Sequence, residues 1–316
     1  MPLASKNVGG DLLVIVGPTS VGKTALSLEL AHEFAGEIIS GDSMQVYRYM
    51  DIGTAKATPE ERAQVPHHLI DLKDPDEAFS VDEFQRLARQ TITQVQGKDH
   101  LPMIVGGTGL YIQSVTHGYQ LPDVKEDPVF RAEMNQWADE KGHEALHQLL
   151  ARKDEQAAAR LHPNDRRRVI RALEIIKESG KTLAEVQQRG PSPYRMIWIG
   201  LTMPRERLYD RINQRVEQMM EEGLLEEVMR LREMGYTREH TSMQALGYKE
   251  LMLYLEGECR LEKAVDLIQQ GTRKYAKRQL SWFRRLPEIH WVDVSEKGFA
   301  REIHRHVAGK FPLYKE

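Results

Sequence analysis

The chain has 316 residues, of which 41% are hydrophobic and 29% are charged, and its formal net charge is −3. This length predicts two domains or one large domain with an insertion, and the composition excludes a disordered, collagen-like or membrane-spanning chain. The one cysteine, Cys259, excludes an intrachain disulfide framework and a zinc site built on several thiolates. The apolar run near the N-terminus, 12–16, is too short for a signal peptide or a membrane span, so we expect a cytoplasmic protein.

Apolar runs alternate with helical periodicity along most of the chain. The run Leu12–Val16 ends at a glycine, and helical periodicity follows over about 22–34, which predicts a strand, a loop and a helix. Helices are also predicted over 204–234 and 261–283. Further short apolar runs predict strands at Glu37–Ser40, Met103–Val105, Met196–Leu201 and Ile289–Val294. This alternation is typical of an α/β fold with a mostly parallel sheet covered by helices.

The segment 116–195 has a different pattern. Its apolar positions follow helical spacing, strand-like runs are absent, and arginine and lysine are dense. Chain-breaking residues flank it at 118–122 and at 190–193. We therefore predict an inserted all-helical domain over 116–195, with the α/β core formed by 1–115 and 196–316.

The loop after the first predicted strand fits the phosphate-binding pattern G-x-x-x-x-G-K-[ST]. Its residues are Gly17, Pro18, Thr19, Ser20, Val21, Gly22, Lys23 and Thr24. The pattern lies between a strand and a helix, as its mechanism requires, because glycines let backbone N–H groups turn toward an anion at the helix N-terminus. Lys23 offers a point charge, and the Thr24 hydroxyl can bind Mg²⁺. The sequence therefore predicts a P-loop NTPase-like core.

The phosphate loop alone leaves the reaction open, since nucleotide hydrolases, small-molecule kinases and transferases with a pyrophosphate leaving group all use it. Hydrolases usually hold Mg²⁺ with an acidic residue at the end of another strand, but here the strand Met103–Val105 runs into 106–111 without one. Asp42 follows the strand Glu37–Ser40, and such strand ends bind ligands in open α/β sheets. By itself, Asp42 fits a turn or a helix cap as well as a catalytic base.

Several short blocks extend the pattern along nearly the whole chain. They are GPTSVGKT at 17–24, SGDSMQVY at 40–47, DIGTAK at 51–56, PHHLID at 66–71, VGGTGLY at 105–111, HPND at 162–165, RALE at 171–174, QALGYK at 244–249 and KRQLSWF at 277–283. In this order they closely resemble the tRNA dimethylallyltransferases, also called isopentenyl-pyrophosphate tRNA transferases, of the IPP transferase family. Eukaryotic members carry a C-terminal zinc finger, which a single cysteine cannot form, so the resemblance is to the bacterial form.

The resemblance implies a reaction and a cofactor. The donor would be dimethylallyl pyrophosphate, the acceptor N6 of the adenosine 3′-adjacent to the anticodon of a tRNA, and Mg²⁺ would be required. Asp42 would remove the N6 proton, because the lone pair of this amine is delocalised into the ring. Thr108 and Arg215 would stabilise the departing pyrophosphate together with the phosphate loop, and Arg278 is a second candidate for this role.

The implied partner is the anticodon stem-loop of tRNA. Lys and Arg outnumber Asp and Glu by seven to three over 160–181 and by six to none over 271–285, although such runs also occur on solvated helix faces. Specific recognition of an RNA loop depends on splayed bases. The residues that we expect to bind tRNA are Asp42, Ser43, Met44, Gln45, Arg131, Arg167, Arg168, Val169, Ile170, Arg171, Gln244, Ala245, Leu246, Gly247, Tyr248 and Lys249.

The residues themselves leave two other functions open. In a P-loop kinase, Asp42 would activate a hydroxyl of a nucleotide or small metabolite. In an RNA-binding nucleotide switch, the phosphate loop would hold a nucleotide without further chemistry. Trp282 and Phe283 fit a helix face in the core better than a base-stacking platform. The helix patterns show no symmetric interface, so we expect a monomer. We also expect no association with membranes.

Overall fold

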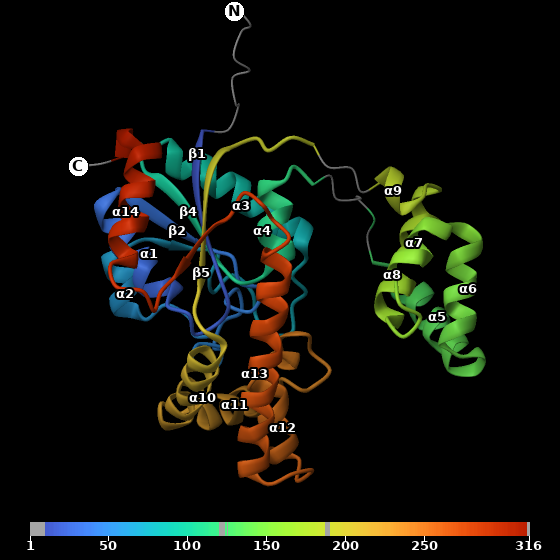
Figure 1. The fold of residues 1–316 in the computed structure, drawn as a ribbon. Helices are drawn as coiled ribbons and strands as arrows, with labels where there is room; N and C mark the ends of the chain where they lie inside the picture. The colour runs from blue at the N-terminus through green and yellow to red at the C-terminus, as the bar shows by residue number, and fades with distance from the viewer. Residues whose placement is uncertain (1–9, 120–123, 125, 187–189, 315–316) are drawn as a thin grey trace, which may run out of the picture. The chain divides into compact units, whose positions relative to one another are not determined.

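The computed structural model describes residues 10–119, 124, 126–186 and 190–314 (Figure 1). Contacts along the chain divide it into two compact units, one formed by Met1–Val115 and Pro193–Glu316 and the other by Thr116–Ser192. The first unit contains the β-sheet, and the regular elements of the second are helices. Among the described residues, no helix is both long enough and apolar enough to cross a bilayer.

The sheet of the first unit has six strands, all parallel, in the order β3-β2-β4-β1-β5-β6. The strands are β1 (Asp11–Val16), β2 (Gly36–Ser40), β3 (His67–His68), β4 (Leu101–Gly106), β5 (Arg195–Thr202) and β6 (His290–Asp293). The α/β fold with a parallel sheet is therefore confirmed. The sequence pattern did not predict β3, because two residues are too short a run to show a period.

Helices cover both faces of the sheet. In Figure 1, α1 (Lys23–Glu33) and α14 (Phe299–Lys310) lie on one side, and α3 (Val81–Gln96) and α4 (Gly109–Thr116) lie on the other. The central strand β1 alternates accordingly: its residues 13 and 15 pack with α1 and α14, and its residues 12, 14 and 16 pack with α3 and α4. Because both faces are buried, β1 is a continuous apolar run rather than an alternating one.

Most of the remaining helices of the first unit form a lobe beside the carboxyl ends of the strands. They are α10 (Arg205–Glu221), α11 (Leu224–Glu233), η1 (Ser242–Gln244), α12 (Tyr248–Leu255) and α13 (Leu261–Phe283). The two short helices α2 (Pro59–Gln64) and η2 (Pro312–Tyr314) are peripheral. The predicted helical stretch 204–234 is two helices, because Gly223 adopts a left-handed φ of 99° between them. Helix α13 has the predicted bounds.

Helix α13 joins the lobe to the sheet. Its N-terminal half contributes Ala264 and Ile268 to the apolar core of the lobe. Its C-terminal half contributes Ala276 to the core on one face of the sheet and Phe283 to the core on the other. The buried side chains on the last turns of α13 are therefore held against the strand ends.

The second unit is a small helical bundle, in which α8 packs against α5, α6 and α9. Its helices are α5 (Pro128–Lys141), α6 (His143–Lys153), α7 (Glu155–Arg160), α8 (Arg166–Ser179) and α9 (Leu183–Val186). The buried carboxylate of Asp154 accepts hydrogen bonds from the backbone N–H groups of Ala157 (2.9 Å) and Leu183 (2.8 Å). It thereby caps α7 and ties it to α9. The predicted insertion ended at residue 195, whereas in the structure Arg195 already begins β5.

Strand β2 carries a buried carboxylate near its start. The side chain of Glu37 is 1% exposed and contacts His68 Nε2 (2.7 Å), His100 Nδ1 (2.7 Å) and Lys98 Nζ (3.0 Å). Burial favours the neutral acid, but the hydrogen bonds from these three side chains outweigh it and lower the pKa of Glu37 to about 2. The contacts link the edge of the sheet to the end of α3.

We expect this carboxylate to make folding stability depend on pH in the acid range. The pKa of Glu37 is lower in the folded chain than its ordinary value of 4.5, so its contribution is present above pH 4.5 and is lost as pH falls toward about 2. Urea unfolding of the wild type and Glu37→Gln between pH 6 and pH 3 measures this. The difference between them should shrink as pH falls. A difference that is constant with pH would contradict the prediction.

Candidate active site

The phosphate loop, 17–24, connects β1 to α1 and encloses its own lysine. Lys23 Nζ donates hydrogen bonds to the carbonyl oxygens of Gly17 (3.1 Å) and Pro18 (2.8 Å). Gly22 has a φ of 106°, which glycine adopts without strain, and α1 begins directly after it with N–H groups that have no acceptor within the helix. Ser20 Oγ is buried and has no hydrogen-bond partner among the described residues. Free donors around a fixed cation form a cradle for a phosphate anion.

Three charged residues from different elements converge on this loop. Burial lowers the pKa of Lys23 to about 8, the charge of Asp42 opposes this shift, and the charge of Arg215 adds to it. Asp42 follows β2, and Arg215 lies on α10, so both reach the lysine only through the tertiary fold. The structure thus brings together the predicted base, the lysine of the phosphate loop and the preferred arginine.

Asp42 lies in the turn after β2. Its Oδ1 accepts a hydrogen bond from the backbone N–H of Met44 (2.8 Å), so the carboxylate does form a turn, as one interpretation of the sequence required. Burial raises the pKa of Asp42 against the opposing effects of backbone hydrogen bonds and the Lys23 charge. A carboxylate with a raised pKa is a stronger base than an exposed one, so forming the turn does not exclude a catalytic role.

Thr108 lies beside Asp42 because the loops after β2 and β4 are held together. The Oγ1 atom of Thr108 accepts a hydrogen bond from Ser43 N (3.1 Å), and its own N–H donates to Gly41 O (3.1 Å). Tyr275 of α13 interacts with the Thr108 side chain, and burial together with the nearby charge of Asp42 raises the pKa of this tyrosine. The predicted residues Asp42 and Thr108 thus share one site, which also contains Tyr275.

Arg278 has different surroundings from Arg215. Its guanidinium carbon lies 5.7 Å from the centre of the Tyr275 ring, in the range of a cation–π contact. It also lines a cavity of about 380 Å³ between α12 and α13, together with Gln244, Leu246, Lys249 and Lys274. Part of the predicted RNA-reading segment 244–249 therefore faces the same cavity as basic residues of α13.

Two other members of that segment are anchors. Tyr248 is fully buried, and Ala245 is 8% exposed. The Tyr248 hydroxyl donates a hydrogen bond to Glu227 Oε1 (2.6 Å), and its ring fills the space that a side chain on Gly53 would need. The side chain of Tyr248 therefore holds the segment in place, whereas Gln244 and Lys249 line the cavity.

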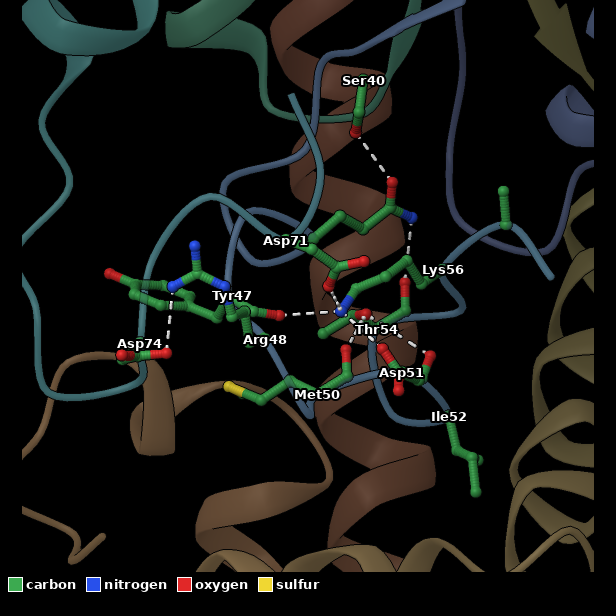
Figure 2. A network of polar contacts seen from close by, with 12 residues as sticks. Ser40, Tyr47, Arg48, Met50, Asp51, Ile52, Thr54, Lys56, Asp71 and Asp74 are labelled. Atoms are coloured by element: carbon green, nitrogen blue, oxygen red, sulfur yellow. Dashed lines mark hydrogen bonds and ion pairs between the residues drawn. The ribbon is translucent and has the colours of Figure 1, made fainter. Parts of the chain in front are cut away.

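The loop 43–56, which follows Asp42, is held by buried and half-buried polar side chains (Figure 2). Gln45 accepts a hydrogen bond from Ser40 Oγ (2.7 Å) and donates to the carbonyl oxygens of residues 54 (3.1 Å) and 55 (3.2 Å). The Lys56 side chain is 0% exposed, and its ammonium lies among Tyr47 O (2.7 Å), Asp51 Oδ1 (2.5 Å) and Asp71 Oδ1 (2.7 Å). The base thus precedes a loop with a rigid interior.

Glu227 of α11 anchors the same loop from the lobe. Its carboxylate, 2% exposed, accepts hydrogen bonds from three successive backbone N–H groups, those of Asp51 (3.0 Å), Ile52 (2.9 Å) and Gly53 (3.3 Å). With the bond from Tyr248, it ties the loop after Asp42 to the segment 244–249. Sequence reasoning missed Glu227, because nothing distinguishes it from the other acidic residues of α11 until the fold brings the loop against it.

The predicted RNA-binding residues of the helical unit fall into three groups. Val169 and Ile170 are buried in its core, so their side chains pack inside the bundle. Arg131 donates two hydrogen bonds of 2.9 Å to the buried carboxylate of Glu174, and Arg171 also binds this carboxylate. By contrast, the two remaining arginines of this set, Arg167 and Arg168, are exposed. Of this set, Arg167 and Arg168 therefore have side chains that RNA phosphates could reach from solvent.

The residues near the phosphate loop fit a magnesium ion of the kind that serves phosphate chemistry. The Thr24 side chain is exposed at the start of α1. Within the described chain, no group of three His, Cys, Asp or Glu residues could hold a metal. Mg²⁺ at such sites binds one or two protein oxygens and completes its shell with water and substrate phosphate, so a single hydroxyl beside a phosphate cradle is a fitting donor.

We expect Glu227→Gln to destabilise the first unit by about 2–4 kcal/mol, because an amide nitrogen would face backbone N–H groups that now have an acceptor. Equilibrium unfolding in urea and hydrogen exchange of 51–53 measure this effect. Glu226→Gln, at the exposed neighbouring position on α11, is the matched control. Equal stability and equal exchange in the two variants would contradict the role of Glu227.

The chain matches known proteins in sequence over almost all of its length. The family model described as IPP transferase matches residues 45–286. A tRNA dimethylallyltransferase of Halalkalibacterium halodurans is 52% identical over 305 residues, which cover 95% of this chain and 97% of the relative. A tRNA dimethylallyltransferase of Bacillus subtilis is 50% identical over 313 residues, which cover 97% of this chain and 99% of the relative.

Solved structures extend the likeness to the fold. The crystal structure of a full-length tRNA isopentenylpyrophosphate transferase from Bacillus halodurans has a TM-score of 0.72 at 50% identity, over 96% of this chain and 97% of that one. A eukaryotic dimethylallyltransferase acting on tRNA has a TM-score of 0.79 at 28% identity, over 97% of this chain and 80% of that one. These matches confirm the resemblance seen in the short sequence blocks, and the chain belongs to the IPP transferase family.

Proposed function

We propose that this protein transfers a dimethylallyl group from dimethylallyl pyrophosphate to N6 of the adenosine 3′-adjacent to the anticodon in tRNA, with release of pyrophosphate. Membership of the IPP transferase family and the names of the bacterial relatives support this function. The observation that carries it within the structure is the convergence of Asp42, Lys23 and Arg215, close enough for both charges to shift the pKa of the lysine.

The two halves of the site suit the two halves of the reaction. Adenine N6 is a poor nucleophile, so a base that removes its proton as the C–N bond forms assists the attack, and Asp42 has the raised pKa that such a base needs. The pyrophosphate gains negative charge as the allylic C–O bond breaks. Fixed cations and backbone donors stabilise that charge, and Lys23, Arg215 and the first N–H groups of α1 are such donors.

Mg²⁺ is part of the proposal. Thr24 would hold it together with pyrophosphate oxygens and water, and the ion would neutralise charge on the leaving group. The phosphate loop would then recognise the donor by its pyrophosphate group. The loop would not distinguish this group from the diphosphate of a nucleotide. The acceptor side of the site therefore has to exclude phosphoryl transfer.

The acceptor side would be formed by the anticodon arm of a tRNA. A base that reacts at the sheet edge must leave its stack, as bases generally do in enzymes that modify them. The cavity lined by Gln244, Lys249 and Arg278 is polar and basic, which suits an RNA loop, and the exposed pair Arg167 and Arg168 would contact phosphates. We place this activity in the cytoplasm and assign it to a monomer.

Asp42→Asn should reduce transfer of radiolabelled dimethylallyl groups to unmodified tRNA by about 100-fold or more, because the amide cannot accept the N6 proton. Binding of tRNA, measured by filter retention, should stay within about two-fold of the wild type. Asp82→Asn, at an exposed position in the first turn of α3, is the control and should not change transfer. Full activity of Asp42→Asn would remove this residue as the base, and turnover of ATP with a small acceptor but not with tRNA would favour a kinase.

The same carboxylate should set the acid limb of the pH profile. A base must be ionised to act, and burial raises the pKa of Asp42 above its ordinary value of 3.8, so activity should be lost as pH falls through a midpoint above 3.8. The measurement is kcat/KM for tRNA between pH 3 and pH 8. A midpoint at or below 3.8 would show that the environment of Asp42 does not act as described.

A further inference from the structure

Helix α13 presents one face to the glycine-rich turn after β4. Tyr275, Gln279 and Trp282 are spaced by four and three residues, which places them on the same side of a helix. Tyr275 interacts with Thr108, as described above. Trp282 packs against Gly109, where an added Cβ would lie 2.3 Å from Trp282 Cδ1. The middle residue of the three, Gln279, contacts the backbone of two loops.

The amide of Gln279 binds the backbone of two loops at once. Its Oε1 accepts a hydrogen bond from Thr19 N in the phosphate loop (2.9 Å). Its Nε2 donates to Gly107 O in the glycine-rich turn (3.1 Å). Gln279 is 5% exposed, and its bond to Gly107 O is buried, while its bond to Thr19 N is partly buried. A single buried group thus joins the loop that carries Lys23 to the turn that carries Thr108.

A primary amide is the functional group that these contacts require. It offers a donor and an acceptor about 2.2 Å apart on a planar group, whereas a carboxylate lacks the donor and an ammonium lacks the acceptor. Gly107 supplies the room. A Cβ at Gly107 would lie 1.9 Å from Gln279 Nε2, while the nearest atom outside this side chain, Gly17 O, would be 3.6 Å away. Gly107 has no left-handed φ, so its lack of a side chain serves the approach of Gln279.

We propose that Gln279 is a positioning residue, which sets the distance between the phosphate loop and the Thr108 turn and so aligns the pyrophosphate leaving group with Asp42. This inference rests on the proposed function. Without the amide, Thr19 N and Gly107 O lose their buried partners, and the two loops can shift relative to each other. A displacement of about 1 Å at such a site costs up to about 100-fold in rate. The effect falls on the pyrophosphate side of the site and not on tRNA binding, since Gln279 is not among the residues that line the cavity between α12 and α13.

Two variants remove one or both of these hydrogen bonds. Gln279→Met keeps the length of the side chain and removes both bonds, and Gln279→Glu keeps an acceptor for Thr19 N but sets an oxygen against Gly107 O. We expect kcat to fall about 10- to 100-fold in both, with the KM for tRNA within about two-fold of the wild type. Gln269→Met is the control on the same helix, because the Gln269 amide donates to Glu217 (3.4 Å) in the lobe. Unchanged kcat in both Gln279 variants would overturn the proposal.

A double-mutant cycle tests the contact itself. Gly107→Ala should impair the wild type, because the new methyl group meets the Gln279 amide. In the Gln279→Ala background the same substitution should cost little more than Gln279→Ala alone, since the obstructing group is gone. Additive losses in the cycle would show that Gly107 and Gln279 act separately and would overturn the proposal. Melting temperatures of all four proteins show whether each is folded at the assay temperature.

Calorimetric titration with inorganic pyrophosphate and Mg²⁺ distinguishes a failure of this inference from a failure of the proposed function. Weaker pyrophosphate binding by Gln279→Met than by the wild type and Gln269→Met supports a positioning role, even if the wild type transfers no dimethylallyl group to tRNA. If the wild type does transfer the dimethylallyl group, equal pyrophosphate binding and equal kcat in the wild type and Gln279→Met would leave the proposed function standing and remove the role of Gln279.

Discussion

The close approach of β2 and β4 at their carboxyl ends is the constraint on which the rest of the site depends. Beyond the strands, Gly41 N donates to Val105 O (2.8 Å) and Thr108 N donates to Gly41 O (3.1 Å), so the pairing continues into the loops. An added Cβ on Gly106 would lie 2.4 Å from the backbone of Gly41, so the two segments can meet only because Gly106 has no side chain. Asp42 and Thr108 follow this contact directly, so the backbone sets their separation.

The loops of the site need polar side chains because they lack the regular hydrogen bonds of helices and strands. Backbone groups that are buried without a partner are costly, and here buried side chains supply the partners. Glu227 accepts from three successive N–H groups, Lys56 donates to a carbonyl oxygen, and Gln279 serves one donor and one acceptor. The same burial shifts the pKa of Lys23 downward and that of Asp42 upward, so rigidity and reactivity have a common cause.

Much of the fold followed from local patterns. The apolar run of β1, the phosphate loop after it and the full length of α13 could be read from the sequence, because each depends on residues that are near neighbours along the chain. The order of short blocks also indicated the family. Strand β3 and the break at Gly223 were not predicted, since a pair of residues has no period and an isolated glycine is tolerated within a helical pattern.

The sequence by itself determined the kinds of residue at the site, and only the tertiary structure decided which of them meet. Asp42 and Lys23 were candidates on their own, but the shift of the lysine pKa by Asp42 and Arg215 depends on three elements folding together. Glu227 and Gln279 had no local signal, because a buried carboxylate or amide acquires its role from backbone groups that lie 172 to 260 positions away in the chain. Such contacts are decided by packing, which no local pattern of residues encodes.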